Sequence, residues 1–125
     1  DHKISENHFN LKLKEKFQIK KIFNYYGMVE QIGSVFFQCE YGYFHTHSFT
    51  DVIIRDNGLK SVIKEQGLVQ ILSILPTSYP GNSILTEDIG KIFGIDNCKC
   101  GKPGKYFKIY ERVEKSEIRG CSDAY

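Results

Sequence analysis

The order of apolar and polar residues predicts one helix near the start of the chain, followed by a series of short strands. In residues 5–17, Phe9, Leu13 and Phe17 stand at i, i+4 and i+8, which places them on one face of a helix. Ser5 precedes this face and is a candidate N-cap. The apolar face is narrow, so the helix is expected to be marginal by itself.

The rest of the chain is divided into short apolar stretches by glycine, proline and polar residues, at the spacing of a small sheet or barrel. The expected strands cover residues 19–25, 34–39, 51–55, 61–64, 68–75, 83–85, 89–93 and 105–110. Asp56-Asn57-Gly58 predicts a turn, because Asn-Gly accepts positive φ. Gln66-Gly67 predicts a hairpin between the strands on either side of it. The expected fold class is therefore α+β and strand-rich, with a short helix and strand before a β-rich body.

Composition and charge add limits to this picture. The chain has 125 residues, 41% hydrophobic and 26% charged, as expected for about one soluble globular domain. A net charge of +2 gives no reason to expect nucleic acid as a partner. No apolar run approaches the ~18 residues that a membrane-spanning helix needs. No secretory signal is evident, so we expect a cytoplasmic protein whose four cysteines are thiols or metal ligands.

The first candidate site is Asn24-Tyr25-Tyr26-Gly27-Met28-Val29-Glu30. Tyr25 or Tyr26 could supply the flat apolar surface that adenine needs. Glu30 could supply the hard oxygen ligand that an ATP-bound Mg²⁺ needs. The alternative is the end of a strand with an exposed glutamate.

Two further segments carry charged groups. Thr86-Glu87-Asp88 stands between two expected strands, and a carboxylate there could accept both hydroxyls of a ribose. The alternative is an ordinary acidic turn. Residues 110–120, which contain Arg112, are by themselves only a charged connector.

In this order, the three segments resemble the motifs of the adenylate-forming superfamily, which includes acyl- and aryl-CoA ligases, peptide-synthetase adenylation domains and luciferases. Tyr26-Gly27-Met28-Val29-Glu30 is similar to the Tyr-Gly-x-Thr-Glu motif, with Val29 in place of Thr. Thr86-Glu87-Asp88 is similar to Thr-Gly-Asp, with Glu87 in place of Gly. Glu111-Arg112 is similar to the Gly-Arg of the interdomain hinge, with Glu111 in place of Gly.

The resemblance implies a nucleotide site. Glu30 is then expected near Mg²⁺ and ATP, Asp88 on the ribose, and Arg112 near the ribose and the hinge. The residues implied in nucleotide binding are Asn24, Tyr25, Tyr26, Gly27, Glu30, Asp88 and Arg112.

A narrower resemblance, to the phenylacetate–CoA ligase group, is carried by Cys39-Glu40, His45, Cys98-Lys99-Cys100-Gly101 and Arg119-Gly120-Cys121-Ser122-Asp123. Within that group the chain looks most like the acyl-protein synthetases of the bacterial luminescence fatty-acid reductase complex. The resemblance implies that a fatty acid is activated as acyl-AMP, with Glu30 and Cys121 as catalytic residues and Cys121 as the acyl acceptor. It also implies acyl-transferase and reductase subunits as partners. Spacing alone favours an inert cysteine beside a loop at Cys121, and only the resemblance implies an acyl acceptor there.

The same resemblance suggests a division of the chain. Residues 1–33 would end an N-terminal α/β subdomain, residues 34–110 would form a distorted β-barrel-like subdomain, and residues 111–125 would be hinge and tail. The sequence contains no Gly/Ser/Thr-rich phosphate loop. We therefore expect the C-terminal part of a longer enzyme, with weak ATP binding of its own and an exposed docking surface through which it could dimerise.

Cys39, His45, Cys98 and Cys100 form a candidate Cys₃His metal set, with His47 as a possible substitute for His45. Thiolates and imidazole are ligands that Zn²⁺ prefers, and four of them close a structural site. The alternative is a group of buried thiols beside a hydrogen-bonded histidine.

These interpretations lead to three hypotheses about function. The first is an acyl-protein synthetase with ATP, Mg²⁺ and a carboxylic acid as ligands. The second is an aryl-CoA ligase in which CoA supplies the thiol. The third is a zinc-stabilised β module that binds a protein partner.

Overall fold

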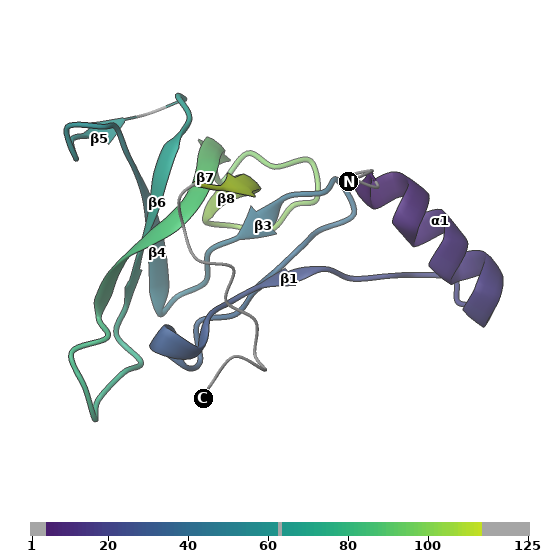
Figure 1. The fold of residues 1–125 in the computed structure, drawn as a ribbon, viewed down its shortest axis with the longest axis horizontal. Helices are drawn as coiled ribbons and strands as arrows, with labels where there is room; N and C mark the ends of the chain where they lie inside the picture. Colours follow the sequence, from purple (N-terminus) through teal and green to yellow (C-terminus); the bar gives the residue numbers. More distant parts are fainter. Residues whose placement is uncertain (1–4, 63, 114–125) are drawn as a thin grey trace.

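The computed structural model describes residues 5–62 and 64–113 (Figure 1). Within these residues, one helix is followed by eight strands and one 3₁₀ turn, η1. The elements are α1 (Glu6–Phe17), β1 (Tyr25–Tyr26), η1 (Val29–Gln31), β2 (Phe36–Phe37), β3 (Phe44–His45), β4 (Thr50–Arg55), β5 (Ser61–Val62), β6 (Gly67–Ser73), β7 (Ser83–Ile95) and β8 (Lys105–Arg112). The expected strand-rich α+β class is confirmed.

Helix α1 forms where the sequence predicts it. Ser5 is its N-cap, and the Ser5 hydroxyl accepts a hydrogen bond from the backbone N–H of His8 at 3.3 Å. Gln18 ends the helix in the left-handed region, with φ of 54°. The helix extends away from the sheets (Figure 1), and Phe9 and Phe17 on its apolar face are 54% and 62% exposed.

The main sheet has six antiparallel strands in the order β3-β8-β7-β6-β4-β5, and β1 and β2 form a separate two-stranded sheet. Strands β3 and β5 are the two edges of the main sheet, so within the described residues it is open. The expected barrel-like closure stays a prediction.

The core lies where alternate residues of the central strands face the small sheet. In the β4–β6 register, Val52 stands opposite Ile71 and Ile54 opposite Val69, and all four are at most 1% exposed. This two-residue period is that of a strand with one buried face. Phe36 from β2 and Phe107 from β8 complete the buried cluster, with their ring centroids 5.3 Å apart.

Three sequence expectations about strands are wrong. Residues 83–85 and 89–93 are one strand, β7, because it pairs along both sides with β6 and β8, and register shifts absorb its irregularities. Residues 61–64 do not form a hairpin with residues 68–75, since β5 and β6 both pair with β4. Residues 19–24 are outside any strand, because β2 offers β1 only two partners.

The turn after β4 forms as predicted, but for a different reason. Leu59 has φ of 60°, whereas Gly58 is not among the glycines with positive φ. The Asp56 carboxylate accepts backbone hydrogen bonds from Gly58 at 2.9 Å and Lys60 at 2.8 Å. The side chain of Asp56 therefore holds this turn.

Candidate functional site

Four of the predicted nucleotide residues come together in one cleft. Gly27 and Glu30 follow β1, while Asp88 and Arg112 lie on β7 and β8. All four line a cavity of about 300 Å³, together with Met28 and residues 84–87. The fold thus brings three separate sequence segments to one place.

Asp88 is the most constrained group of this cleft. Asp88 and Arg112 are cross-strand partners, and Arg112 Nε lies 3.6 Å from Asp88 Oδ1. The Tyr26 hydroxyl donates to Asp88 Oδ2 at 2.6 Å. The backbone N–H of Asp88 donates to Thr86 Oγ1 at 3.2 Å, and that hydroxyl donates to the Val69 carbonyl at 2.8 Å. These contacts fix the orientation of the carboxylate before any ligand arrives.

Tyr26 connects the cleft to the core. Its ring packs against Phe36, Phe44 and Phe107, with centroid separations of 6.0–6.4 Å. Burial, followed by the hydrogen bond to Asp88, raises the pKa of Tyr26 far above its ordinary value. Tyr26 is therefore a neutral donor to a carboxylate throughout the physiological pH range.

Glu30 lies in η1 with its side chain exposed, and the next residue, Gln31, holds this turn in place. Gln31 is 0% exposed, and Gln31 Nε2 donates to the carbonyl of Gly81 at 2.7 Å. The backbone N–H of Ile32 donates to the Tyr79 hydroxyl at 3.1 Å. Sequence reasoning missed Gln31, because a lone glutamine gives no signal of burial.

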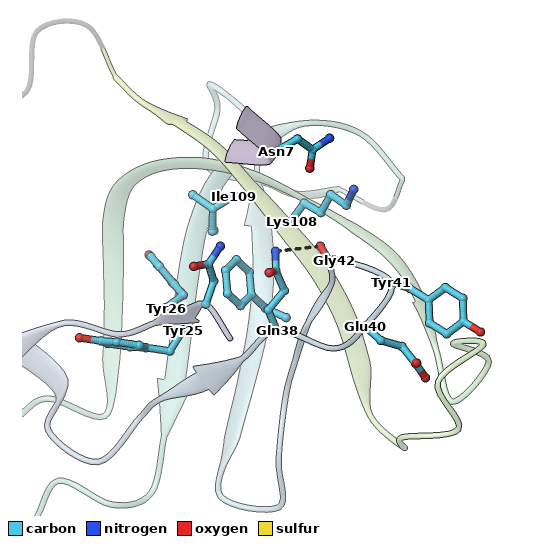
Figure 2. Close-up of a pocket in the computed structure, with 11 residues that line it drawn as sticks. Asn7, Tyr25, Tyr26, Gln38, Glu40, Tyr41, Gly42, Lys108 and Ile109 are labelled. Atoms are coloured by element: carbon cyan, nitrogen blue, oxygen red, sulfur yellow. Dashed lines mark hydrogen bonds between the residues drawn. The ribbon is translucent and has the colours of Figure 1, made fainter. Parts of the chain in front are cut away.

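Two other predicted nucleotide residues face a different space. Asn24 and Tyr25 line a cavity of about 590 Å³ together with Tyr26, Gln38 and Lys108 (Figure 2). One wall is the loop between β2 and β3, where Gln38 Nε2 donates to the Gly42 carbonyl at 3.4 Å. Tyr26 belongs to the wall of this cavity and also reaches Asp88 in the cleft.

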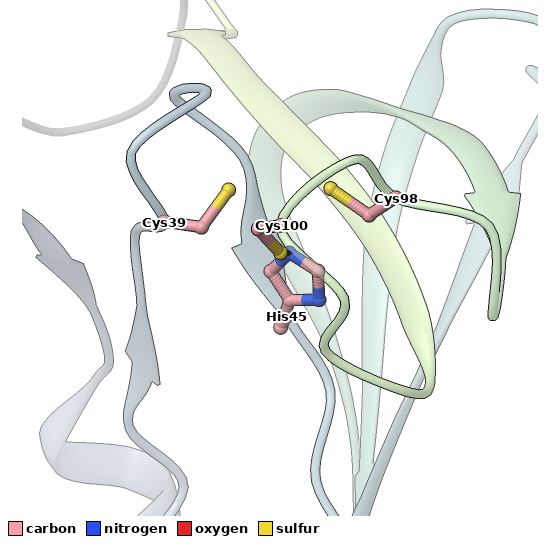
Figure 3. A group of neighbouring side chains, drawn as sticks. All are labelled: Cys39, His45, Cys98 and Cys100. Atoms are coloured by element: carbon pink, nitrogen blue, oxygen red, sulfur yellow. Dashed lines mark hydrogen bonds between the residues drawn. The ribbon is translucent and has the colours of Figure 1, made fainter.

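The predicted metal residues also converge. Cys39, His45, Cys98 and Cys100 point toward one another (Figure 3), and their ligand atoms all lie within 4.8 Å of one another. His45 is the second residue of β3, and the three cysteines lie in the β2–β3 and β7–β8 loops. His45 Nε2 is 3.3 Å from Cys100 Sγ. His47 is exposed and packs against Phe36 instead, so it is not the histidine of this group.

The two loops share one backbone design. The carbonyl of Cys39 accepts from the N–H of Gly42 at 2.9 Å, and the carbonyl of Cys98 accepts from the N–H of Gly101 at 3.0 Å. Both glycines have φ of 76°, a conformation that strongly favours glycine. Each loop is thus a tight turn that begins with a cysteine and closes on a glycine.

The surroundings of the cluster shift the pKa values of its members in different directions. Burial raises the pKa of Cys98. Burial opposes ionisation of Cys100 as well, but the backbone N–H of Lys102 and the neighbouring thiols lower its pKa. Burial, together with the charge of Lys102, lowers the pKa of His45, so the imidazole is neutral at neutral pH. A neutral imidazole beside a thiol whose pKa is lowered suits a metal ion.

Cys121, the predicted acyl acceptor, and the hinge residues after Val113 lie outside the described residues. No helix in the described part of the chain is long and apolar enough to cross a membrane.

The comparison with protein families places the chain in a class of enzymes, the acyl-protein synthetases. The matching family is described as "Acyl-protein synthetase, LuxE", and the match covers residues 1–125, so the chain belongs to this family. Searches of curated proteins and of solved structures gave no match. The family match confirms the resemblance drawn from the motifs.

Proposed function

We propose that this chain forms the nucleotide-facing, C-terminal part of an ATP-dependent acyl-protein synthetase. In the first step, an oxygen of a fatty-acid carboxylate attacks the α-phosphorus of ATP. An acyl–phosphate bond forms, and pyrophosphate leaves. In the second step, a cysteine thiolate attacks the acyl carbon, a thioester forms, and AMP leaves.

The observation that carries the proposal is the shared cleft of Glu30, Asp88 and Arg112. A carboxylate that is already oriented by Tyr26 and Arg112 is suited to accept the two hydroxyls of a ribose. Glu30 stands exposed at the same cleft, where a hard oxygen ligand would meet the Mg²⁺ of ATP. Arg112 supplies positive charge beside a nucleotide whose phosphates are negative.

The first step is tested by exchange of labelled pyrophosphate into ATP, which reports acyl-AMP formation alone. In the complete enzyme, Glu30→Gln, Asp88→Asn and Arg112→Ala are each expected to lower this exchange by about 10²-fold or more, since each removes a charged contact to the nucleotide. Glu65→Gln is the matched control, because Glu65 is exposed and does not line the cleft. Full exchange in all three variants would refute the nucleotide assignment.

The acceptor of the second step separates the two ligase hypotheses. We propose Cys121 as the acceptor, so a labelled acyl group should remain covalently on the enzyme and be released by hydroxylamine. Cys121→Ser should abolish this labelling while pyrophosphate exchange continues. Label that appears on added CoA, with no dependence on Cys121, would favour the aryl-CoA ligase alternative instead.

A further inference from the structure

We propose that Cys39, His45, Cys98 and Cys100 bind one structural Zn²⁺, which cross-links the β2–β3 loop to the β7–β8 loop and fixes one wall of the large cavity. The proposal is independent of the nucleotide site. It rests on the positions of the four side chains and on the two matched turns that present them.

The distances suit a metal ion of this size. With Zn–S bonds of ~2.3 Å, the sulfur atoms of a tetrahedral site stand roughly 3.8 Å apart. The four candidate ligand atoms lie within 4.8 Å of one another, and His45 Nε2 is 3.3 Å from Cys100 Sγ. A contraction of about an ångström at the longest separation would therefore complete the site.

The composition of the set points to a structural role. Four protein ligands leave no open position for water or substrate, whereas catalytic zinc sites keep one open. Cys39, His45 and Cys98 are each at most 8% exposed, so the ion would be shielded from solvent. Three thiolates leave one excess negative charge around Zn²⁺, and Lys102, which acts electrostatically on His45 and Cys100, offsets it.

The backbone supports the same conclusion. In the β2–β3 loop the N–H of Gly42 donates to the carbonyl of Cys39 at 2.9 Å, and in the β7–β8 loop the N–H of Gly101 donates to the carbonyl of Cys98 at 3.0 Å. The tight turns at Gly42 and Gly101 aim the first cysteine of each loop at the same point.

A metal cross-link here would stabilise a part of the fold that is otherwise weakly held. Strand β3 has only two residues and is an edge strand, whose partner is β8. The β2–β3 loop that ends in it provides Glu40, Tyr41 and Gly42 to the wall of the 590 Å³ cavity. A two-residue strand pairing is weak by itself. A metal bond at each end of residues 39–45 would hold the wall in place.

The test measures zinc content, with Zn²⁺ alone as the probe. The reduced chain is incubated with Zn²⁺, desalted and analysed by elemental mass spectrometry, and ~1 zinc per chain is expected. Cys98→Ser and His45→Gln should lose the bound metal. His47→Gln is the matched control and should retain it, since His47 lies outside the cluster.

A second readout uses only the unaltered chain, in case a variant does not fold. Zinc should protect Cys39, Cys98 and Cys100 from alkylation, and a chelator should expose them together. Substoichiometric zinc in the wild type, equal zinc in wild type and Cys98→Ser, or a disulfide within the cluster would each overturn the proposal. Chelator-independent alkylation of the three cysteines would do so as well.

Discussion

The hydroxyl of Tyr26 donates a 2.6 Å hydrogen bond to Oδ2 of Asp88, a residue 62 positions further along the chain. The contact joins the end of β1 to the middle of β7. The ring of Tyr26 packs on core aromatics, and its hydroxyl reaches the cleft that Glu30 and Arg112 line. One side chain therefore couples the core to the proposed nucleotide site.

Tyr26→Phe should lower the free energy of unfolding by about 1–2 kcal/mol, since it removes a hydrogen bond to a charged acceptor in a partly buried place. Urea denaturation followed by circular dichroism measures this. Tyr25→Phe is the matched control, because Tyr25 is 69% exposed. Equal midpoints for the two variants would contradict the role given to this contact.

The same tyrosine predicts a pH dependence. Its pKa is raised in the folded protein, so the unfolded chain loses this proton near the ordinary tyrosine value of 10.0 while the folded chain keeps it. The stability that Tyr26 provides is therefore complete below pH 10.0 and declines as the pH rises above it. Urea denaturation at a series of alkaline pH values should show a shallower decline for Tyr26→Phe than for Tyr25→Phe. Parallel declines would be inconsistent with this assignment.

Gln31→Met should destabilise the protein by about 1–3 kcal/mol, because it keeps the volume but leaves the buried Gly81 carbonyl without its donor. Thermal unfolding monitored by circular dichroism checks the effect. Glu40→Met is a suitable control, since Glu40 is exposed. We expect the Gln31 variant also to loosen the turn that carries Glu30, visible as faster amide exchange in residues 28–32. An unchanged melting temperature would argue against the role of Gln31.

Gly90→Ala should destabilise the sheet by roughly 1–3 kcal/mol through overpacking. A Cβ at Gly90 would stand 2.6 Å from a methyl of Val69 and 2.7 Å from the Lys108 carbonyl. Gly58→Ala is the control, because its Cβ would meet only the Asp56 carboxylate, at 3.4 Å. The two midpoints of urea unfolding give the comparison, and equal values would mean that β7 can shift away from β6.

Metal removal should loosen one region of the molecule rather than all of it. If zinc holds the two loops, a chelator should speed amide hydrogen exchange in residues 38–46 and 96–105. Exchange in residues 52–54 and 69–71 of the core should change little, because those strands are held by apolar packing. A uniform increase across both groups would show that the ion supports the whole fold.

Part of the site could be predicted from the sequence, because motif spacing identifies residue types that suit one chemistry. The four members of the thiol cluster were identified in this way, whereas Glu30, Asp88 and Arg112 were identified through the resemblance of their segments to the motifs of a known family. The sequence could not predict which residues line the same cavity. Asn24 and Tyr25 were expected beside Glu30 but line a different cavity. The role of Gln31 was invisible, since burial of a polar side chain depends on neighbours from distant segments.

The sequence by itself determined the helix at residues 6–17, the strands near residues 51–55 and 68–75, and the residue types of both candidate sites. The helix and the strands depend on neighbours in the chain, through capping and through runs of β-prone residues between turns. Only the tertiary structure decided that β6 pairs with β4 instead of β5, that β7 is one continuous strand, and that His45 rather than His47 joins the cysteines. Those outcomes depend on packing between segments that lie far apart in the chain, where local patterns carry no information.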